Sequence, residues 1–314
     1  MSLEDPVVIT CAISGAIANR DQCPAIPYTP EEYGAEARRI VEEGGVHIHI
    51  HARKPDGTPS YEVDDFLAIR DAIRAEVGDA AIINFSTGTV GVPVAKRIAY
   101  LEAGRPEVAA LNMGSMNYAK YSRSRKDFVF KFVFANPFEE IIELLEAMRR
   151  LEIKPEHECF DVGHVGSLAP FVDMGLLEAP LHADFVMGVV GGIPASARNV
   201  AAMADNLQVV GAGGRVSIPK HHWGVIGIGR DQWMLVAAAL TLGGSIRVGL
   251  EDNFYLPDGE MARSNGDLIA AARRLTEELG RRPATVDEAR RLLGIGNLSA
   301  APDGVALGIH EPAA

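Results

Sequence analysis

The sequence predicts a single (β/α)8 TIM-like barrel followed by a C-terminal helical extension. Short runs rich in Val and Ile alternate with amphipathic helical patterns up to about residue 250, and no long linker interrupts the series. Eight such strand-like runs are present, the number that closes a parallel barrel. We expect the barrel to occupy residues 1–264 and the extension residues 265–314. An open doubly wound sheet, which shows the same alternation, is the alternative.

The composition is that of a globular protein and excludes some functions. The chain has 314 residues, 47% of them hydrophobic, and a net charge of -12. This acidity argues against a nucleic-acid partner, because phosphates require a basic surface. No apolar run approaches the ~18 residues that cross a bilayer, and the acidic N-terminus is unlike a signal peptide, so we expect a cytoplasmic protein. Cys11, Cys23 and Cys159 are too scattered for a disulfide framework or a metal knuckle.

The first strand and helix have clear sequence signals. The run Val7–Ile13 is nearly all apolar, which is typical of a parallel strand buried on both faces. Residues Thr29–Glu32 then supply an N-cap threonine, a proline at the first helical position and a capping-box glutamate. The pair Gly44–Gly45 ends the helix that they begin.

The same alternation places the later elements. The remaining seven strands are expected near Val46–His51, Ala81–Phe85, Val108–Asn112, Cys159–Gly163, Phe185–Val189, Trp223–Ile228 and Ser245–Leu250. Helices are expected at Pro137–Leu151 and Arg230–Leu242, and Phe128–Phe134 is a possible additional strand.

Two further helices form the predicted extension. Residues Asp267–Leu279 form a charged amphipathic helix, and a second capping box at Thr285–Glu288 begins a short helix that runs to Leu293. Such helices can pack on the barrel, cover its mouth or reach a neighbouring subunit. Barrels of this kind commonly associate, so we expect a homo-oligomer.

Three histidines on the second strand indicate a metal site. Because side chains alternate along a strand, His47, His49 and His51 all point to one face. His49 and His51 lie nearest the C-terminal end of the strand, where barrel active sites form, and two imidazoles at this spacing can share one metal ion. Zinc suits neutral imidazole ligands, and no thiolate cluster competes for it. The alternative is a set of core histidines bonded to their neighbours.

The end of the last strand offers a carboxylate ligand. Glu251 lies at the same mouth in a closed barrel, and as a third ligand it would give a His2Glu site with an open coordination position. The alternative is that Glu251 and Asp252 only cap a loop.

Other polar or glycine-rich segments give weaker signals. The turns Ser86–Gly91 and Gly191–Ser196 present backbone N–H groups that suit a carboxylate or phosphate, although glycines in such loops are also common for steric reasons. Neither turn matches a dinucleotide fingerprint, so a nicotinamide cofactor is not expected. We expect His221 and His222 in a loop before the seventh strand, away from the site. The isolated His157, His164 and His182 receive no assignment.

Several of these segments, taken in order, resemble one enzyme family, the β-keto acid cleavage enzymes (BKACE). The resemblance rests on His49–Arg53, Phe85–Gly88, Asn112–Asn117, Phe160–His164, Trp223–Arg230 and Arg247–Asn253. It extends from the first strand to the C-terminal helices. Each motif is modest alone, and together they are specific.

The resemblance implies a zinc-dependent barrel enzyme that converts a β-keto acid and acetyl-CoA into acetoacetate and a new acyl-CoA. It implies His49, His51 and Glu251 as zinc ligands, and Arg247 and Asp252 as a catalytic dyad that activates the nucleophile. The implied substrate-binding residues are Ser86, Thr87, Gly88, Ser115 and Asn117. Ser115 stands where the family has threonine, and it keeps the hydroxyl group.

One departure from the family bears on the substrate. Members that act on an amino-substituted β-keto acid carry a glutamate in the loop after the first strand, and Ser14–Ala18 contains none. If Ile17 takes that place, a cationic amine has no partner there, and a neutral or apolar β-keto acid is favoured. Arg20, slightly downstream, would instead favour an anionic tail.

Two other functions remain open at this point. A zinc hydrolase of the amidohydrolase kind also uses an HxH motif, but normally on the first strand, whereas here the motif lies on the second. A non-catalytic barrel that binds a metal or acyl-CoA is the other alternative.

Overall fold

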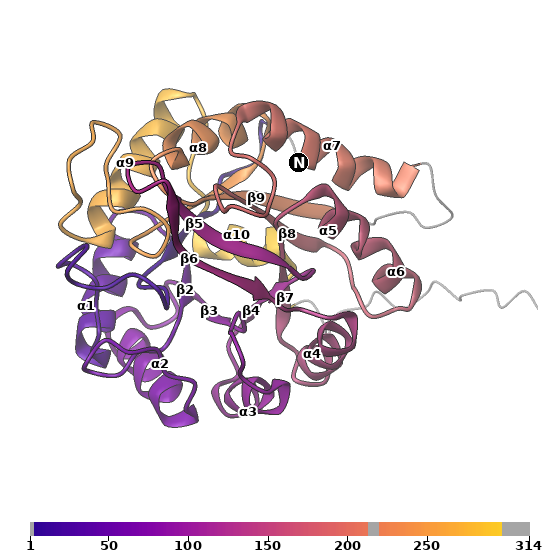
Figure 1. Cartoon of the computed structure of the whole chain (residues 1–314), viewed down its shortest axis with the longest axis horizontal. Coiled ribbons are helices and arrows are strands. Elements are labelled where there is room, and N and C mark those ends of the chain that lie inside the picture. The colour runs from indigo at the N-terminus through magenta and orange to yellow at the C-terminus, as the bar shows by residue number, and fades with distance from the viewer. Residues whose placement is uncertain (1–2, 213–219, 297–314) are drawn as a thin grey trace, which may run out of the picture.

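The structure is a closed barrel of eight parallel strands surrounded by helices, which confirms the predicted fold class (Figure 1). It is a computed structural model that describes residues 3–212 and 220–296. The strands adjoin in the order β1-β10-β9-β8-β7-β4-β3-β2, and every neighbouring pair is parallel. The barrel strands are β1 (Ile9–Ala12), β2 (His47–Ile50), β3 (Ile82–Ser86), β4 (Val108–Asn112), β7 (Lys154–Cys159), β8 (Leu181–Met187), β9 (His221–Gly227) and β10 (Ser245–Val248).

Helices follow most of the barrel strands. They are α1 (Pro30–Glu42), α2 (Val63–Val77), α3 (Val94–Gly104), α4 (Phe138–Arg150), α5 (Val162–Gly166), α6 (Leu168–Asp173), α7 (Ala197–Ala212), α8 (Gln232–Thr241), α9 (Asn265–Glu278) and α10 (Val286–Leu293). The capping boxes predicted at Thr29 and Thr285 are both formed, and each satisfies free N–H groups at the start of its helix. None of the helices in the described ranges has the length and apolarity that crossing a bilayer requires.

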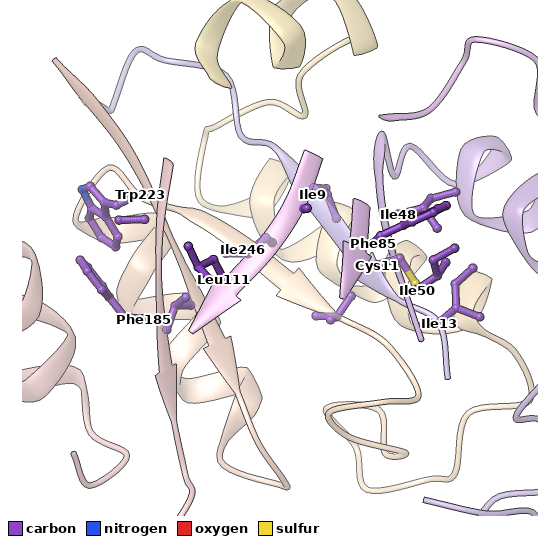
Figure 2. Close-up of a cluster of buried hydrophobic side chains, with 14 of the residues drawn as sticks. Ile9, Cys11, Ile13, Ile48, Ile50, Phe85, Leu111, Phe185, Trp223 and Ile246 are labelled. Carbon is purple, nitrogen blue, oxygen red and sulfur yellow. The ribbon is translucent and has the colours of Figure 1, made fainter. Parts of the chain in front are cut away.

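The main hydrophobic core fills the space between the barrel and its helices. Ile48 and Ile50 alternate with the histidines of β2, and both are fully buried in this core. Figure 2 shows them beside Ile13, which follows β1, and Phe85, which lies on β3. The core therefore fixes the outward face of β2, and the histidines must point into the barrel.

The fifth predicted strand was displaced from its true position. It was expected at Cys159–Gly163, whereas β7 ends at Cys159 and Asp161 caps α5. The strand was missed because Glu156 and Glu158 interrupt its apolar pattern. Both carboxylates point into the barrel, where polar side chains are unusual and where this protein concentrates them.

A β-hairpin is inserted between β4 and α4, and it accounts for the possible extra strand. Its strands β5 (Met116–Ser122) and β6 (Asp127–Phe134) pair with each other and lie outside the barrel sheet. Figure 1 looks down the barrel and shows the hairpin crossing the centre of the ring of helices. The hairpin contacts the loop after β8 through the backbone N–H of Ala119, which donates to the carbonyl of Val190 over 3.2 Å.

The two C-terminal helices occupy different places. Helix α9 packs against α1, α8 and the strands β1 and β10, and thereby completes the ring around the barrel. Helix α10 covers the amino-terminal end of the barrel with Ala289 and Leu293, which pack on Val8, Val46 and Val108. Among the three placements that the sequence allowed, the described helices therefore pack on the barrel, and α10 does so at the end opposite the mouth. Residues 297–314 of the predicted extension lie outside the described ranges.

Candidate metal centre and active site

The carboxyl ends of the barrel strands open into a cavity of about 890 Å³. His49 and His51, from β2 and the residue following it, line this cavity together with Glu251, which follows β10. Residues of the β5–β6 hairpin also line it. Active sites of (β/α)8 barrels form at this end, because the loops after all eight strands converge there.

Three side chains predicted from the sequence meet at this cavity. His49 Nε2 lies 3.7 Å from Glu251 Oε2, and His51 Nε2 lies 3.5 Å from Glu251 Oε1. The rings of the two histidines are 5.3 Å apart. These ligand atoms all lie within 4.8 Å of one another, the arrangement that a single metal ion requires.

The protonation of these groups also suits a metal ion. Burial, and then the charge of Arg247, lower the pKa of His49 well below its usual value, so its imidazole is neutral. Burial alone would raise the pKa of Glu251, but Arg247 and the two histidines outweigh it and hold this pKa well below the usual range. Glu251 Oε2 is buried and makes no hydrogen bond. Neutral imidazole and an ionised carboxylate with a free oxygen fit a zinc ion.

Gly15 allows Glu251 to take this position. A Cβ atom at Gly15 would lie 2.7 Å from Glu251 Cγ, and the residue has a φ of +61°. Any side chain at position 15 would push the carboxylate away from the histidines. The loop after β1 therefore needs glycine at this point for a steric and a conformational reason.

Arg247 is buried beside the three proposed ligands and is surrounded by carboxylates. It donates to both oxygens of Asp252 over 2.9 and 3.0 Å, to Glu251 Oε1 over 2.9 Å and to Glu158 Oε1 over 3.2 Å. Burial opposes its charge, but Asp252, Glu251 and Glu158 outweigh burial and raise the pKa of Arg247 well above its usual value. Arg247 is therefore a fixed positive charge on the cavity floor.

The carboxylates around Arg247 differ in their affinity for protons. Burial raises the pKa of Asp252 to about 6, against the lowering effect of Arg247. Burial raises the pKa of Glu158 to about 8, again against Arg247. Perturbed acids of this kind, held in one cavity, are typical of a site that transfers protons.

A second polar cluster fills the barrel beneath the cavity. Glu156, His182 and Asp184 are buried there, and His182 Nε2 lies 3.1 Å from Asp184 Oδ2 and 3.8 Å from Glu156 Oε1. His222 belongs to this cluster, because its ring lies 5.7 Å from the ring of His182. The expected loop position of His221 and His222 was therefore wrong: both residues are on β9, and His222 is buried inside the barrel.

The structure separates the predicted substrate-binding residues into two groups. Ser86 and Gly88 line the cavity, and the Ser86 hydroxyl accepts a hydrogen bond from the Gly88 N–H. Thr87, Ser115 and Asn117 are not on the cavity wall. The Thr87 hydroxyl donates to the carbonyl of Ala110, and the Ser115 hydroxyl accepts from the backbone N–H of Asn136. Asn117 is exposed on the opposite face of β5 from Tyr118, which does line the cavity.

The loop after the first strand is apolar where it meets the cavity. Ala16, Ile17 and Ala18 line the wall, and Ile17 is 58% exposed. Arg20 is not on this wall, because its guanidinium pairs with Glu32 and lies over the ring of Tyr28. This position gives no support to a role of Arg20 in binding an anionic tail, which stays a prediction.

Several cavity residues were not found from the sequence. Glu158 was missed because its strand was misplaced, and the alternation of Glu156 and Glu158 around His157 was the available signal. The aromatic wall was missed because the hairpin was treated only as a possible strand. It consists of Tyr118, Phe130, Phe132, Phe134 and Phe160.

Comparisons with known proteins give a matching family, similar sequences and a similar fold. Residues 6–295 match the family described as beta-keto acid cleavage enzyme (BKACE). The chain is 35% identical over 292 residues to a 3-keto-5-aminohexanoate cleavage enzyme from Fusobacterium nucleatum subsp. nucleatum, covering 93% of this chain and 98% of that protein. It is 34% identical over 308 residues to a 3,5-dioxohexanoate:acetyl-CoA acetone transferase from Paraburkholderia graminis, covering 93% and 97%. The fold is similar to that of ObcA in a binary complex with oxaloacetate, with a TM-score of 0.70, 22% identity, and coverage of 87% and 68%.

Proposed function

This chain belongs to the beta-keto acid cleavage enzyme family, and from that membership we propose that it is a zinc-dependent acyltransferase for a neutral or apolar β-keto acid. Its co-substrate in this proposal is acetyl-CoA, and its products are acetoacetate and a new acyl-CoA. One relative is named as an acetyl-CoA-dependent transferase of 3,5-dioxohexanoate, which supports a co-substrate and a substrate of these classes.

The proposal rests mainly on how the side chains are arranged at the floor of the cavity. Two histidines face the carboxylate of Glu251, and the same carboxylate accepts a hydrogen bond from the buried Arg247. This arrangement supports a metal site at these three residues, directly beside a fixed positive charge. A β-keto acid needs both, because negative charge develops on its oxygens when C2 loses a proton.

Zinc held by His49, His51 and Glu251 would supply Lewis acidity to the oxygens of the β-keto acid. The exchange requires that C2 of the keto acid lose a proton, form a bond to the acetyl carbonyl carbon and release the CoA thiolate. The thiolate then attacks the original keto carbon, the bond from that carbon to C2 breaks, and C2 regains the proton. Every atom of the two substrates is found in the two products, and the exchange needs no oxidant or reductant.

We assign the proton acceptor to Asp252 and the charge stabilisation to Arg247. A pKa of about 6 leaves Asp252 ionised at neutral pH and close to the value of an efficient general base. Arg247 is a poor base because its surroundings raise its pKa further. Its role is to orient Asp252 through two hydrogen bonds and to lie beside the developing negative charge.

The wall of the cavity favours a substrate without a cationic group. In the described part of the chain, the acidic side chains that line the cavity are Glu158, Glu251 and Asp252, and all three are hydrogen-bonded to Arg247. None is left to pair with an ammonium group. A cationic amine would therefore be desolvated without a partner, whereas an apolar acyl chain would meet the apolar side chains of Ile17 and Phe160.

A product analysis tests the proposal. Zinc-loaded protein is incubated with a panel of apolar, anionic and cationic β-keto acids, with and without acetyl-CoA carrying a labelled acetyl group. We expect labelled acetoacetate and the new acyl-CoA only when both substrates are present, and fastest with a neutral or apolar acid. Release of free acids without consumption of acetyl-CoA would indicate a hydrolase, and zinc binding with no turnover would indicate a non-catalytic barrel.

The metal site is tested by the Glu251→Gln variant. The amide keeps the shape of the side chain but loses the charge that zinc requires, so we expect weaker retention of zinc during dialysis and loss of turnover. Glu260→Gln, at an exposed position in a later loop, is the control and should leave both properties unchanged. Wild-type zinc content in Glu251→Gln would contradict the assignment of this ligand.

A further inference from the structure

The β5–β6 hairpin carries a concentration of positive charge that the rest of this acidic chain lacks. It contains one acid, Asp127, and five basic residues, Lys120, Arg123, Arg125, Lys126 and Lys131. Some basic side chains elsewhere are paired with acids; Arg74 and Arg290, for example, both pair with Glu107. Within residues 3–212 and 220–296, the five basic side chains of the hairpin form no ion pair.

The two faces of the hairpin have different chemistry. The cross-strand pairs Met116–Phe134, Tyr118–Phe132 and Lys120–Phe130 lie on one face, because directly paired residues point the same way. All of these residues except Met116 line the cavity. Lys131 and Val133 alternate with them and face away, and Val133 is 64% exposed. The cavity face is therefore an aromatic ladder that ends at a lysine.

The aromatic ladder is continuous along the hairpin. The ring of Tyr118 lies 5.3 Å from that of Phe132 and 6.1 Å from that of Phe130, and both pairs are nearly parallel. At the inner end, Phe134 packs with Phe160 and Ile226 on the barrel, and Ile226 is paired with Arg247. The ladder thus begins beside the proposed reaction centre and runs outward to Lys120 and the basic turn.

The length of this ladder matches one part of coenzyme A. From Phe134 to Phe130, β6 spans about 14 Å at the usual rise of a strand. The chain from the thiol to the first phosphate of coenzyme A has about twelve bonds, equivalent to roughly four extended residues or about 14 Å. With the thioester at the inner end, the diphosphate would lie at Lys120, and the 3′-phosphate would lie nearer the turn at residues 123–126.

We propose that the β5–β6 hairpin is the binding element for the coenzyme A part of acetyl-CoA, both its pantetheine arm and its nucleotide. Tyr118, Phe130 and Phe132 hold the pantetheine arm, Lys120 binds the diphosphate, and the basic turn binds the 3′-phosphate. Lysine and arginine form charge-assisted hydrogen bonds with phosphate oxygens, and the free cations on the hairpin supply these donors. This inference rests on the proposed function, because it takes acetyl-CoA as the co-substrate.

Calorimetric titration with CoA, 3′-dephospho-CoA and pantetheine separates the parts of this binding element. The variants are Lys120→Ala, the triple variant Arg123→Ala/Arg125→Ala/Lys126→Ala, and the control Lys131→Ala on the outer face of the same hairpin. We expect Lys120→Ala to raise the Kd of CoA and of 3′-dephospho-CoA about tenfold. The triple variant should raise the Kd of CoA by a similar factor and that of 3′-dephospho-CoA by much less.

Pantetheine should bind all variants alike, and Lys131→Ala should bind CoA within about twofold of wild type, since its charge faces away. The Kd of CoA for the wild type should rise with salt concentration. Circular dichroism and sedimentation report folding and assembly of each variant. An altered oligomeric state without weaker CoA binding would identify the basic turn as a contact between copies of the chain and overturn the inference.

Turnover with acetyl-CoA and with acetyl-pantetheine separates a failure of this inference from a failure of the proposed function. If the wild type forms acetoacetate and the hairpin variants keep its Kd for CoA and its KM for acetyl-CoA, the inference alone is wrong. If the wild type neither binds CoA nor forms acetoacetate, the proposed function is wrong and the inference fails with it. A higher KM for acetyl-CoA with an unchanged KM for acetyl-pantetheine in Lys120→Ala would support both.

Discussion

Replacing Arg247 with lysine is expected to abolish most of the catalytic rate while the protein stays folded and retains its metal. The substitution keeps one positive charge among Asp252, Glu251 and Glu158, so none of these buried carboxylates loses all compensation. It removes the planar fork, because an ammonium group cannot bond both oxygens of Asp252 in parallel.

The hydrogen bonds of Arg247 give the expected loss of stability and of kcat in Arg247→Lys. Arg247 donates four hydrogen bonds to three carboxylates, and lysine in this position can reach one or two of them. Two or three of these bonds are lost, and charged hydrogen bonds contribute about 1.5–3 kcal/mol each, so the free energy of unfolding should fall by at least about 3 kcal/mol. Loss of one oriented group that stabilises charge in the transition state typically costs a factor of about 10²–10³ in kcat.

The assay measures kcat for acetoacetate formation, zinc content, and unfolding in denaturant for the wild type and two variants. The matched control is Arg281→Lys, since Arg281 is also buried and donates to the carbonyls of Gly244 and Asp5, far from the cavity. The control should lose stability and keep its kcat. A kcat for Arg247→Lys within about threefold of wild type would refute the role assigned to the dyad.

Three other predictions test different parts of the molecule. His51→Ala should lower bound zinc from one equivalent toward zero in metal analysis, while His164→Ala, a histidine outside the proposed ligand set, should keep it; equal zinc in both variants would remove the site. Ile17→Glu should raise kcat/KM for an amino-substituted β-keto acid relative to an apolar one by about tenfold, and Ile17→Gln should not. Burial lowers the pKa of His182 to about 4, below its value of about 6.5 in the unfolded chain, so its contribution to stability is present above pH ~6.5 and is lost as the pH falls toward 4. Between pH 7 and pH 5, the free energy of unfolding should therefore fall by about 2 kcal/mol more in the wild type than in His182→Asn. An equal fall in the two proteins would contradict the assigned pKa.

The barrel could be predicted from the sequence because the local strand patterns agree with the way the side chains pack in the structure. Ile48 and Ile50 alternate with the histidines, and this period of two allows only one face of β2 to enter the core. Once the barrel closes, the ends of β2 and β10 must meet at the same mouth, so the meeting of His49 with Glu251 follows from fold class and strand order. The prediction failed at β7 because Glu156 and Glu158 are polar residues on an inward face, where an apolar pattern is normally expected.

The sequence by itself determined the fold class, the two histidines and the carboxylate that converge at the mouth, and the family, since each depends on the type and order of residues along the chain. Only the tertiary structure decided the contact of Arg247 with Glu158, the aromatic wall of the cavity and the positions of Thr87, Ser115 and Asn117 away from it. Contacts of this kind join residues that are distant in sequence, and their geometry depends on strand register and on how an inserted hairpin folds over the barrel. No local pattern encodes that geometry, because it arises only when the whole barrel packs.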